Sequence, residues 1–362
     1  MTDLLDTPEE EDLRASVRSM LAAGCPWQSV LAFVSGGGEP FDAAAWRRLA
    51  VEMGLAGLLV PEEYGGAGAH WRAAAVVLEE LGRAVAPVPF LTSAVVATAA
   101  LRSAGGAFPL GPLASGAPTA ALAVPFGAVA VRPTVTASGG RLTGSVRGVA
   151  DGLGAGVLLV PAAEGLWVVE GDAGVVRTPV VSLDETRPLC DLAFAGAPAR
   201  LVANGPAAAA NALRTAATMV AAEQVGVASW CLDSTVEYVR TRHQFGRPVG
   251  SFQAVKHRLA DLWVDLTQAR AVLRHAVADL ATGGADAPVA SALAKIVCSE
   301  VAVRAAEECV QLHGGIGFTW EHPAHLYLKR AKATAIAYGS PDRHRARLAA
   351  LVDLPAPPLE VA

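Results

Sequence analysis

The residues around Arg242 have the chemistry to hold a phosphate group. Residues 240–254 read Arg-Thr-Arg-His-Gln-Phe-Gly-Arg-Pro-Val-Gly-Ser-Phe-Gln-Ala. A guanidinium is always charged and offers two parallel N–H donors to phosphate oxygens. A polar connection between two helices, with Arg242 and Arg247 in solvent, would use the same residue types. The segment by itself therefore leaves both an anion site and a solvated loop open.

A glycine-rich segment farther along, residues 311–317, could approach such a ligand through its backbone. It reads Gln-Leu-His-Gly-Gly-Ile-Gly. Glycines let backbone amides come close to a bound group, although glycines after a helix are also typical of a C-cap and turn. The segment is not the dinucleotide-binding fingerprint of a βαβ unit, because no strand precedes it and no ribose-binding acid follows. We expect His313 to be packed or hydrogen-bonded rather than catalytic.

Three regions of different character must position these segments. Residues 1–113 have helical patterns, and residues 204–362 have long helical patterns with short connections, which are typical of a four-helix bundle. Between them, residues 114–203 carry short apolar runs separated by Gly, Pro and Asp, which predict short antiparallel strands in a sandwich or barrel. The fold class expected is therefore an α+β multidomain protein. The predicted strands are Ala120–Val124, Val129–Val135, Arg141–Val149, Val157–Val160, Leu166–Val169 and Val175–Val180, and the longest predicted helices cover 206–240, 251–280, 288–312 and 324–338.

Composition and net charge argue against several classes of protein. The chain has 362 residues, is 52% hydrophobic and has a net charge of −5. That charge provides no basic patch for nucleic acid, and the apolar runs are too interrupted to predict a membrane span. Five scattered cysteines and an acidic start without a signal-peptide pattern favour a cytoplasmic protein with reduced thiols. We expect neither a disulfide frame nor a metal site.

The order of the regions, the two segments above and residues 328–340 together resemble the acyl-CoA dehydrogenase family. The resemblance extends over nearly the whole chain and is strongest over residues 222–340. It implies an FAD cofactor, with Arg242 on the pyrophosphate, Phe245 packed near the cofactor and Gln253 hydrogen-bonded to it.

The resemblance also implies contacts with the FAD of a neighbouring subunit. In the family, the segment that matches Gln311, Gly314 and Gly315 crosses a dimer interface to hold that cofactor. Ser340 and Asp342 match positions near the flavin. Asp342 is expected either to contact FAD or to cap the helix that follows it.

At the catalytic base the chain departs from the family. Family members use a carboxylate, tuned by burial, to remove the α-proton of an acyl-CoA while the β-hydrogen passes as hydride to FAD. Here Tyr338 occupies that position, and a phenol with a pKa of about 10 is a poor base at neutral pH. The position that some members use on the long first bundle helix falls at Ala216. Glu223, two turns farther on, is an alternative base or an interface hydrogen-bonding residue.

The middle region also departs from the family, at the segments that touch the flavin ring. The family's Thr-Glu-Pro-Gly-x-Gly-Ser-Asp corresponds to residues 120–127, which read Ala-Ala-Leu-Ala-Val-Pro-Phe-Gly. Where the family has a Trp-Ile-Thr-Asn segment beside the flavin ring, residues 147–153 of this chain read Arg-Gly-Val-Ala-Asp-Gly-Leu. Asp184-Glu185-Thr186-Arg187 does follow the family pattern, and Arg187 is expected to pair with an acid at a domain boundary.

These observations lead to three hypotheses. The first is a family subunit that desaturates an acyl-CoA only with a related partner chain, resembling the bacterial heteromers that act on CoA esters of steroid side chains. The second is a self-sufficient homo-oligomeric dehydrogenase with Glu223 as base. The third is a scaffold that binds no flavin. The family further implies an electron-transfer flavoprotein as the acceptor of electrons.

Overall fold

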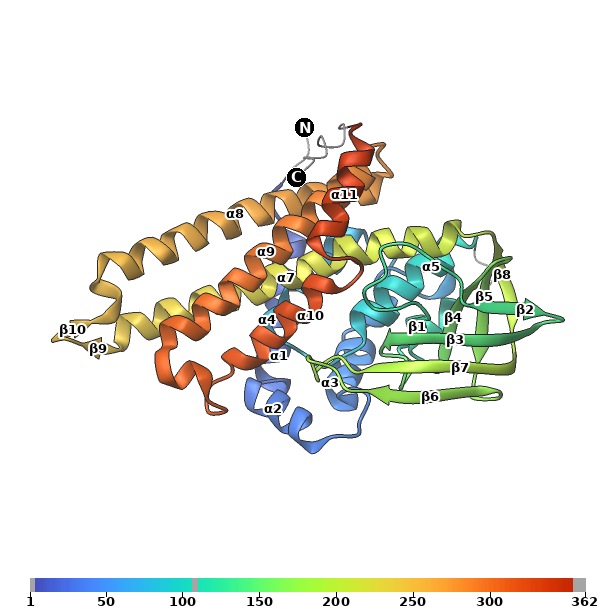
Figure 1. Ribbon diagram of the computed structural model, residues 1–362, viewed down its shortest axis with the longest axis horizontal. Helices are drawn as coiled ribbons and strands as arrows, with labels where there is room; N and C mark the ends of the chain where they lie inside the picture. Colours follow the sequence, from blue (N-terminus) through green and yellow to red (C-terminus); the bar gives the residue numbers. More distant parts are fainter. Residues whose placement is uncertain (1–3, 106–109, 354–362) are drawn as a thin grey trace, which may run out of the picture.

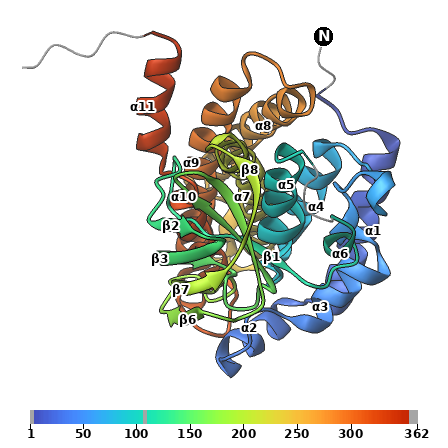
Figure 2. The same cartoon turned by 90° about the vertical axis from the view of Figure 1, so that its right-hand side faces the viewer.

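The computed structural model describes residues 4–105 and 110–353, which form a helical region, a β region and a helical bundle in that order. Helix α7 (Ala207–Thr241) runs along the molecule and connects the β region to the far end of the bundle (Figure 1). In the view turned by 90°, the N-terminal helices lie on one side of the strands, and the last helix, drawn in red, stands on the other (Figure 2). The expected order of helical, strand and helical regions is confirmed.

The first region begins with α1 (Pro8–Gly24), whose start is fixed by a capping box. The Thr7 hydroxyl accepts a hydrogen bond from the Glu10 backbone N–H, and the Glu10 carboxylate accepts one from the Thr7 N–H. Two backbone donors that the helix cannot satisfy itself are thereby paired. The remaining elements are α2 (Trp27–Gly36), α3 (Ala43–Arg47), η1 (Arg48–Glu52), η2 (Leu55–Gly57), η3 (Glu62–Tyr64), α4 (Trp71–Ala84), η4 (Phe90–Ala97), α5 (Thr98–Ser103) and α6 (Leu110–Ala114).

The β region consists of two four-stranded sheets around a shared apolar core. One sheet has the order β1-β4-β5-β8 and the other β2-β3-β7-β6, and side chains such as Leu142, Leu158 and Leu192 fill the core. The expectation of antiparallel pairing is wrong at one edge, because β1 pairs with β4 in parallel, with Ala120 opposite Val157. The strands are β1 (Ala120–Leu122), β2 (Val135–Ser138), β3 (Arg141–Ala150), β4 (Val157–Ala162), β5 (Gly165–Glu170), β6 (Val175–Val180), β7 (Leu189–Pro198) and β8 (Arg200–Asn204).

Two other strand predictions differ from the structure. Of the predicted strand Val129–Val135, only Val135 belongs to a strand; Pro133 in that run has no N–H to donate to a sheet. Strands β7 and β8 were not predicted at all. β7 is rich in Ala and Gly, which have low β-propensity, so its sequence pattern is weak.

The bundle matches the predicted helices closely and is centred on α9 (Ala287–His313), which packs against each of the other four. Helix α10 ends two residues earlier than predicted, at Ile336, because Tyr338 adopts a positive φ of 53°. The other helices are α8 (Gln253–Thr282), α10 (Ala324–Ile336) and α11 (Pro341–Leu351).

The described helices and the cysteines bear on two of the predictions made from composition. In the part of the chain that is described, no helix combines the length and apolarity needed to cross a bilayer. All five cysteines are buried free thiols, as expected.

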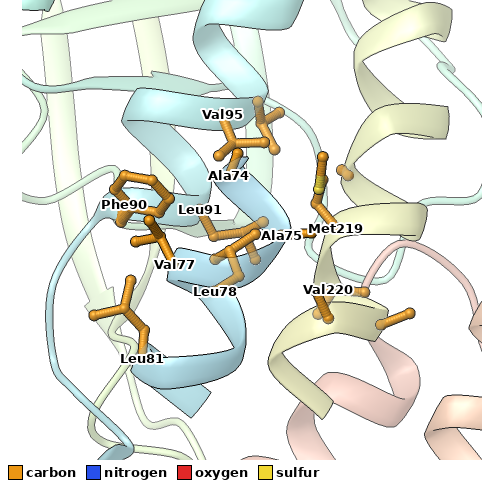
Figure 3. Close-up of a cluster of buried hydrophobic side chains, with 14 of the residues drawn as sticks. Ala74, Ala75, Val77, Leu78, Leu81, Phe90, Leu91, Val95, Met219 and Val220 are labelled. Atoms are coloured by element: carbon orange, nitrogen blue, oxygen red, sulfur yellow. The ribbon is translucent and has the colours of Figure 1, made fainter. Parts of the chain in front are cut away.

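The N-terminal region and the bundle are joined where α4 crosses α7. Figure 3 shows the apolar contact, with Ala75 and Leu78 of α4 facing Met219 and Val220 of α7. One turn beyond it, the backbones approach so closely that a Cβ at Gly226 would lie 1.8 Å from the Glu79 carbonyl oxygen. Only glycine permits this approach, and it sets the distance between the two regions.

Replacing Gly226 by alanine is therefore expected to lower the free energy of unfolding by about 3 kcal/mol, despite the better helix propensity of alanine. The clash is with backbone atoms, which cannot rotate away. Denaturant unfolding measures the change. Gly36→Ala is the matched control, because a Cβ there meets nothing within 4 Å; equal losses in both variants would contradict the close crossing.

Candidate functional site

The segment around Arg242 forms a small hairpin that projects from the end of α7. The Arg242 N–H donates to the Tyr238 carbonyl (2.8 Å), and the Arg242 carbonyl accepts from Val249 N–H (2.8 Å). Strand β9 (His243–Gln244) then pairs with β10 (Arg247–Pro248). At the tip, Phe245 and Gly246 have φ angles of 53° and 76°, as a two-residue hairpin turn with positive φ at both positions requires.

The hairpin presents its predicted cofactor residues to solvent. The Arg242 side chain is exposed, and Phe245 is 91% exposed. Gln253, the first residue of α8, is also exposed.

The glycine-rich segment lies at the same end of the bundle as the hairpin (Figure 1). Helix α9 ends at His313, Gly314 takes a φ of 62°, and a Cβ at Gly314 or Gly315 would meet nothing within 4 Å. Gln311 and both glycines are exposed. Their backbone is therefore open to approach from outside the chain.

His313 joins the two segments. Its ring stacks on Tyr238 of α7 at 4.4 Å between centroids, and its Nδ1 lies 2.7 Å from the Cys309 carbonyl oxygen. Through these contacts the buried His313 side chain holds the end of α7 against the end of α9. The prediction that His313 is a packed, hydrogen-bonded residue is confirmed.

Tyr338 packs against the β region, away from the hairpin and the glycine-rich segment. Its backbone N–H donates to the Phe126 carbonyl (2.6 Å), and its ring meets the Phe126 ring edge-on at 5.6 Å. The neighbouring cavity, lined by Thr92, Val96 and Ala150 among others, measures about 10 Å³. That is room for about one water molecule.

Burial keeps the Tyr338 phenol protonated. The side chain is 4% exposed, and burial raises its pKa above the ordinary value despite the nearby Arg187 guanidinium. A phenol in this state is a poor proton acceptor. The structure thus encloses Tyr338 in aromatic and aliphatic packing.

Glu223 is held between two arginines. Its carboxylate accepts from Arg187 at 2.6 and 3.2 Å and from Arg330 at 2.7 Å. Burial would raise its pKa, but Arg187 and Arg330 outweigh that effect and lower it to about 2. Such a carboxylate stays ionised and binds protons weakly, which makes it unsuited to the role of base. Arg187 does pair with an acid between regions, as expected, and Arg330 also pairs with Asp184 (2.6 Å).

Asp151 is a buried carboxylate near the same place that the sequence did not single out. It is 8% exposed, accepts a hydrogen bond from Thr92 (2.7 Å), and follows Ala150, which lines the Tyr338 cavity. Burial raises its pKa to about 6, although Arg187 and the Thr92 hydroxyl oppose the shift. The only sequence signal was an acid at the end of an apolar strand, directly before Gly152.

Asp151→Asn is expected to stabilise the protein at pH 7.5 by about 1–3 kcal/mol, from a pKa raised by about two units. The folded carboxyl binds its proton more tightly than the unfolded one, so wild-type stability falls as pH rises from about 4 through 6. The variant has no such loss, and asparagine also tolerates the positive φ of 55° at this position. Thermal unfolding at pH 4 and 7.5 measures this, with exposed Asp261→Asn as control. A variant less stable than wild type at both pH values would contradict the assignment.

The prediction that Asp342 caps helix α11 is wrong. Ser340 is the N-cap residue, Pro341 begins the helix, and Asp342 lies in its first turn, paired with Arg345 at 2.8 Å. Proline has no N–H and is favoured at the first position of a helix, so α11 begins at Pro341. This start is two residues earlier than a helix capped by Asp342 would have. Ser340 is half-buried and Asp342 is exposed.

The two ends of the bundle differ in their fit to a flavin cofactor. The exposed Arg242, Gln311 and open glycines suit an anionic, nucleotide-containing group held outside this chain. The space beside Tyr338 does not suit a flavin ring, because Phe126 and Tyr338 fill it. Across residues 4–105 and 110–353, His, Cys, Asp and Glu side chains form no group of three that could hold a metal ion.

A three-part layout with a bundle of this kind is the fold of acyl-CoA dehydrogenases. Residues 7–107 match the acyl-CoA dehydrogenase N-terminal domain and residues 203–352 the C-terminal domain. The acyl-CoA dehydrogenase IpdE2 of Mycolicibacterium smegmatis is 40% identical over 86% of this chain and 89% of its own length. The chain belongs to the acyl-CoA dehydrogenase family, whose members are FAD-dependent oxidoreductases acting on CH–CH bonds.

Two solved structures are similar over nearly the full length. One is a variant of the Tcur3481-Tcur3483 steroid ACAD, with 34% identity, a TM-score of 0.87, and coverage of 95% of this chain and 98% of that one. The other is the ChsE4-ChsE5 complex from Mycobacterium tuberculosis, with 31% identity, a TM-score of 0.88, and coverage of 98% and 100%. Both are assemblies of two different chains by their names.

Proposed function

We propose that this chain is one subunit of a heteromeric acyl-CoA dehydrogenase and leaves proton abstraction to its partner. The observation that carries the proposal is the contrast between the enclosed Tyr338 position and the exposed Arg242 and Gln311 segments. The first has no space for a substrate, and the nearby carboxylate of Asp151 is buried and hydrogen-bonded to Thr92. The second has the donors for a cofactor bound by another subunit.

In this proposal Arg242 binds the pyrophosphate of the shared FAD, while Phe245 and Gln253 contact the cofactor. Gln311, Gly314 and Gly315 reach the part held by the related subunit, whereas Ser340 and Asp342, beside Tyr338, do not take part in that contact. Bound FAD would supply hydride acceptance for the β-hydrogen of the acyl-CoA, and the related subunit would supply the base for the α-proton. Electrons then leave to an electron-transfer flavoprotein.

The proposed substrates are CoA esters of steroid side chains. The support is the similarity to a structure named as a steroid ACAD, at 34% identity over 95% of the chain. The self-sufficient alternative with Glu223 as base is disfavoured by the pairing of that carboxylate with Arg187 and Arg330.

Co-expression tests the proposal. The chain is purified alone and together with a related dehydrogenase subunit from the same genome, and flavin content, oligomeric size and bleaching by acyl-CoA are measured. We expect yellow protein that is bleached by substrate only in the two-chain preparation. Bleaching of flavin in a preparation of this chain alone would overturn the requirement for a partner.

Tyr338→Phe in the two-chain enzyme is expected to leave turnover within about threefold of wild type, because a general base contributes about 10²–10⁴-fold and this phenol is not one. The ring, and with it the packing on Phe126, is retained. Steady-state turnover with a fixed acyl-CoA measures the effect. A fall of about 100-fold without a change in flavin content would make Tyr338 a catalytic residue.

A further inference from the structure

A second pocket lies between the N-terminal helices and the bundle. It measures about 290 Å³ and is lined by parts of α1, α4, α7, α10 and the link between α1 and α2. None of its lining residues borders the Tyr338 cavity or belongs to the Arg242 and Gln311 segments. Its size falls at the lower end of the range for small-molecule sites.

One wall of this pocket is a preformed aromatic surface. The Trp230 ring stacks flat on the Tyr327 ring, with centroids 3.6 Å apart and planes within 3°. The Tyr327 hydroxyl donates to the Arg83 carbonyl (2.7 Å), so its polar atom is already paired within the protein. Trp27, half-buried, also lines the pocket. Rigid aromatic walls favour a ligand with a flat ring.

Two arginines give the pocket an anion-binding side. Arg18 donates from Nε and Nη2 to Glu80 (2.8 and 2.7 Å), and Arg83 pairs through Nη1 with Asp233 (2.7 Å). A guanidinium has five N–H donors, and these contacts use only part of them. The Arg18 side chain remains 54% exposed and that of Arg83 29% exposed.

We propose that this pocket binds a small flat-ring compound that carries a carboxylate or a similar anionic group. The ring would pack against Trp230 and Trp27, and the anion would accept hydrogen bonds from Arg83 and Arg18. The unused guanidinium N–H groups favour an anionic acceptor, because Glu80, which also lines the pocket, and Asp233 occupy only part of the donors of Arg18 and Arg83. This site is independent of the shared FAD and of the acyl-CoA.

Calorimetric titration of the full chain with 2-naphthoate tests the site. We expect saturable binding of one molecule per chain, with quenching of tryptophan fluorescence. Ala22→Trp, which adds a ring at a lining residue, is expected to weaken binding at least about tenfold. Ala23→Trp is the matched control, since Ala23 is exposed and does not line the pocket. Equal affinity in both variants would overturn the location.

The anionic part of the proposal has its own test. The uncharged analogue 2-naphthamide is expected to bind about tenfold more weakly than 2-naphthoate in wild type. Arg83→Gln should reduce that difference, since Arg18 remains, while leaving 2-naphthamide binding unchanged, because the Tyr327 contact is to the Arg83 backbone. Equal binding of the two probes to wild type would overturn the anion site, and no saturation up to about 1 mM 2-naphthoate would overturn the pocket as a binding site.

Discussion

Glu223→Gln is expected to lower the free energy of unfolding by about 3–5 kcal/mol, because it leaves two buried arginines without their shared carboxylate. Arg187 and Arg330 are 4% and 1% exposed, and both donate to Glu223. Glutamine has one acceptor oxygen and places N–H donors against the second guanidinium. Breaking a buried pair costs more than the pair itself contributes, since the remaining charges stay desolvated.

The loss of stability caused by Glu223→Gln should be smaller at low pH than at neutral pH. The folded pKa of Glu223 is about 2, below its unfolded value. The stability it provides is therefore fully present above about pH 4.5 and is lost as pH falls toward 2. We expect the difference between wild type and variant to shrink across that window.

Denaturant unfolding at pH 7 and 3 measures both effects, with Glu237→Gln as the control on the same helix, where the side chain is 70% exposed. The experiment also separates the two roles considered for Glu223. A variant with wild-type stability whose isolated chain loses dehydrogenase turnover would support a relocated base and contradict the structural role.

Arg242→Ala is expected to weaken FAD binding by the two-chain enzyme about 100-fold, while leaving the fold and the assembly intact. A charge-assisted hydrogen bond contributes about 1.5–3 kcal/mol, and a bidentate pair with phosphate involves two. The exposed side chain contributes little to folding, because the end of α7 is held by backbone bonds of Arg242 to Tyr238 and Val249.

Flavin titration of the apo two-chain enzyme gives the dissociation constant directly. Arg240→Ala is the matched control, since Arg240 is two residues away and 74% exposed, with a 4.0 Å pair to Glu237. Equal flavin affinity in the two variants would show that Arg242 is a solvated residue at a helix end, which was the other interpretation of this segment.

The sequence by itself determined the family, the order of the three regions and the long helices. Helices such as α9 follow from local periodicity and end where Gly314 permits a positive φ, so neighbouring residues suffice to predict them. Tyr338 also stood out in the sequence, because the resemblance led us to expect a carboxylate at that place in the motif.

Only the tertiary structure decided what the unusual residues do. Whether Glu223 is a base or an ion-pair partner depends on Arg187 and Arg330, which lie 36 and 107 residues away along the chain. The raised pKa of Asp151 likewise comes from burial by segments distant in sequence. The packing of Phe126 against Tyr338 also joins residues that are far apart along the chain. Charge pairing and desolvation are set by distances in space, and spacing along the chain does not specify them.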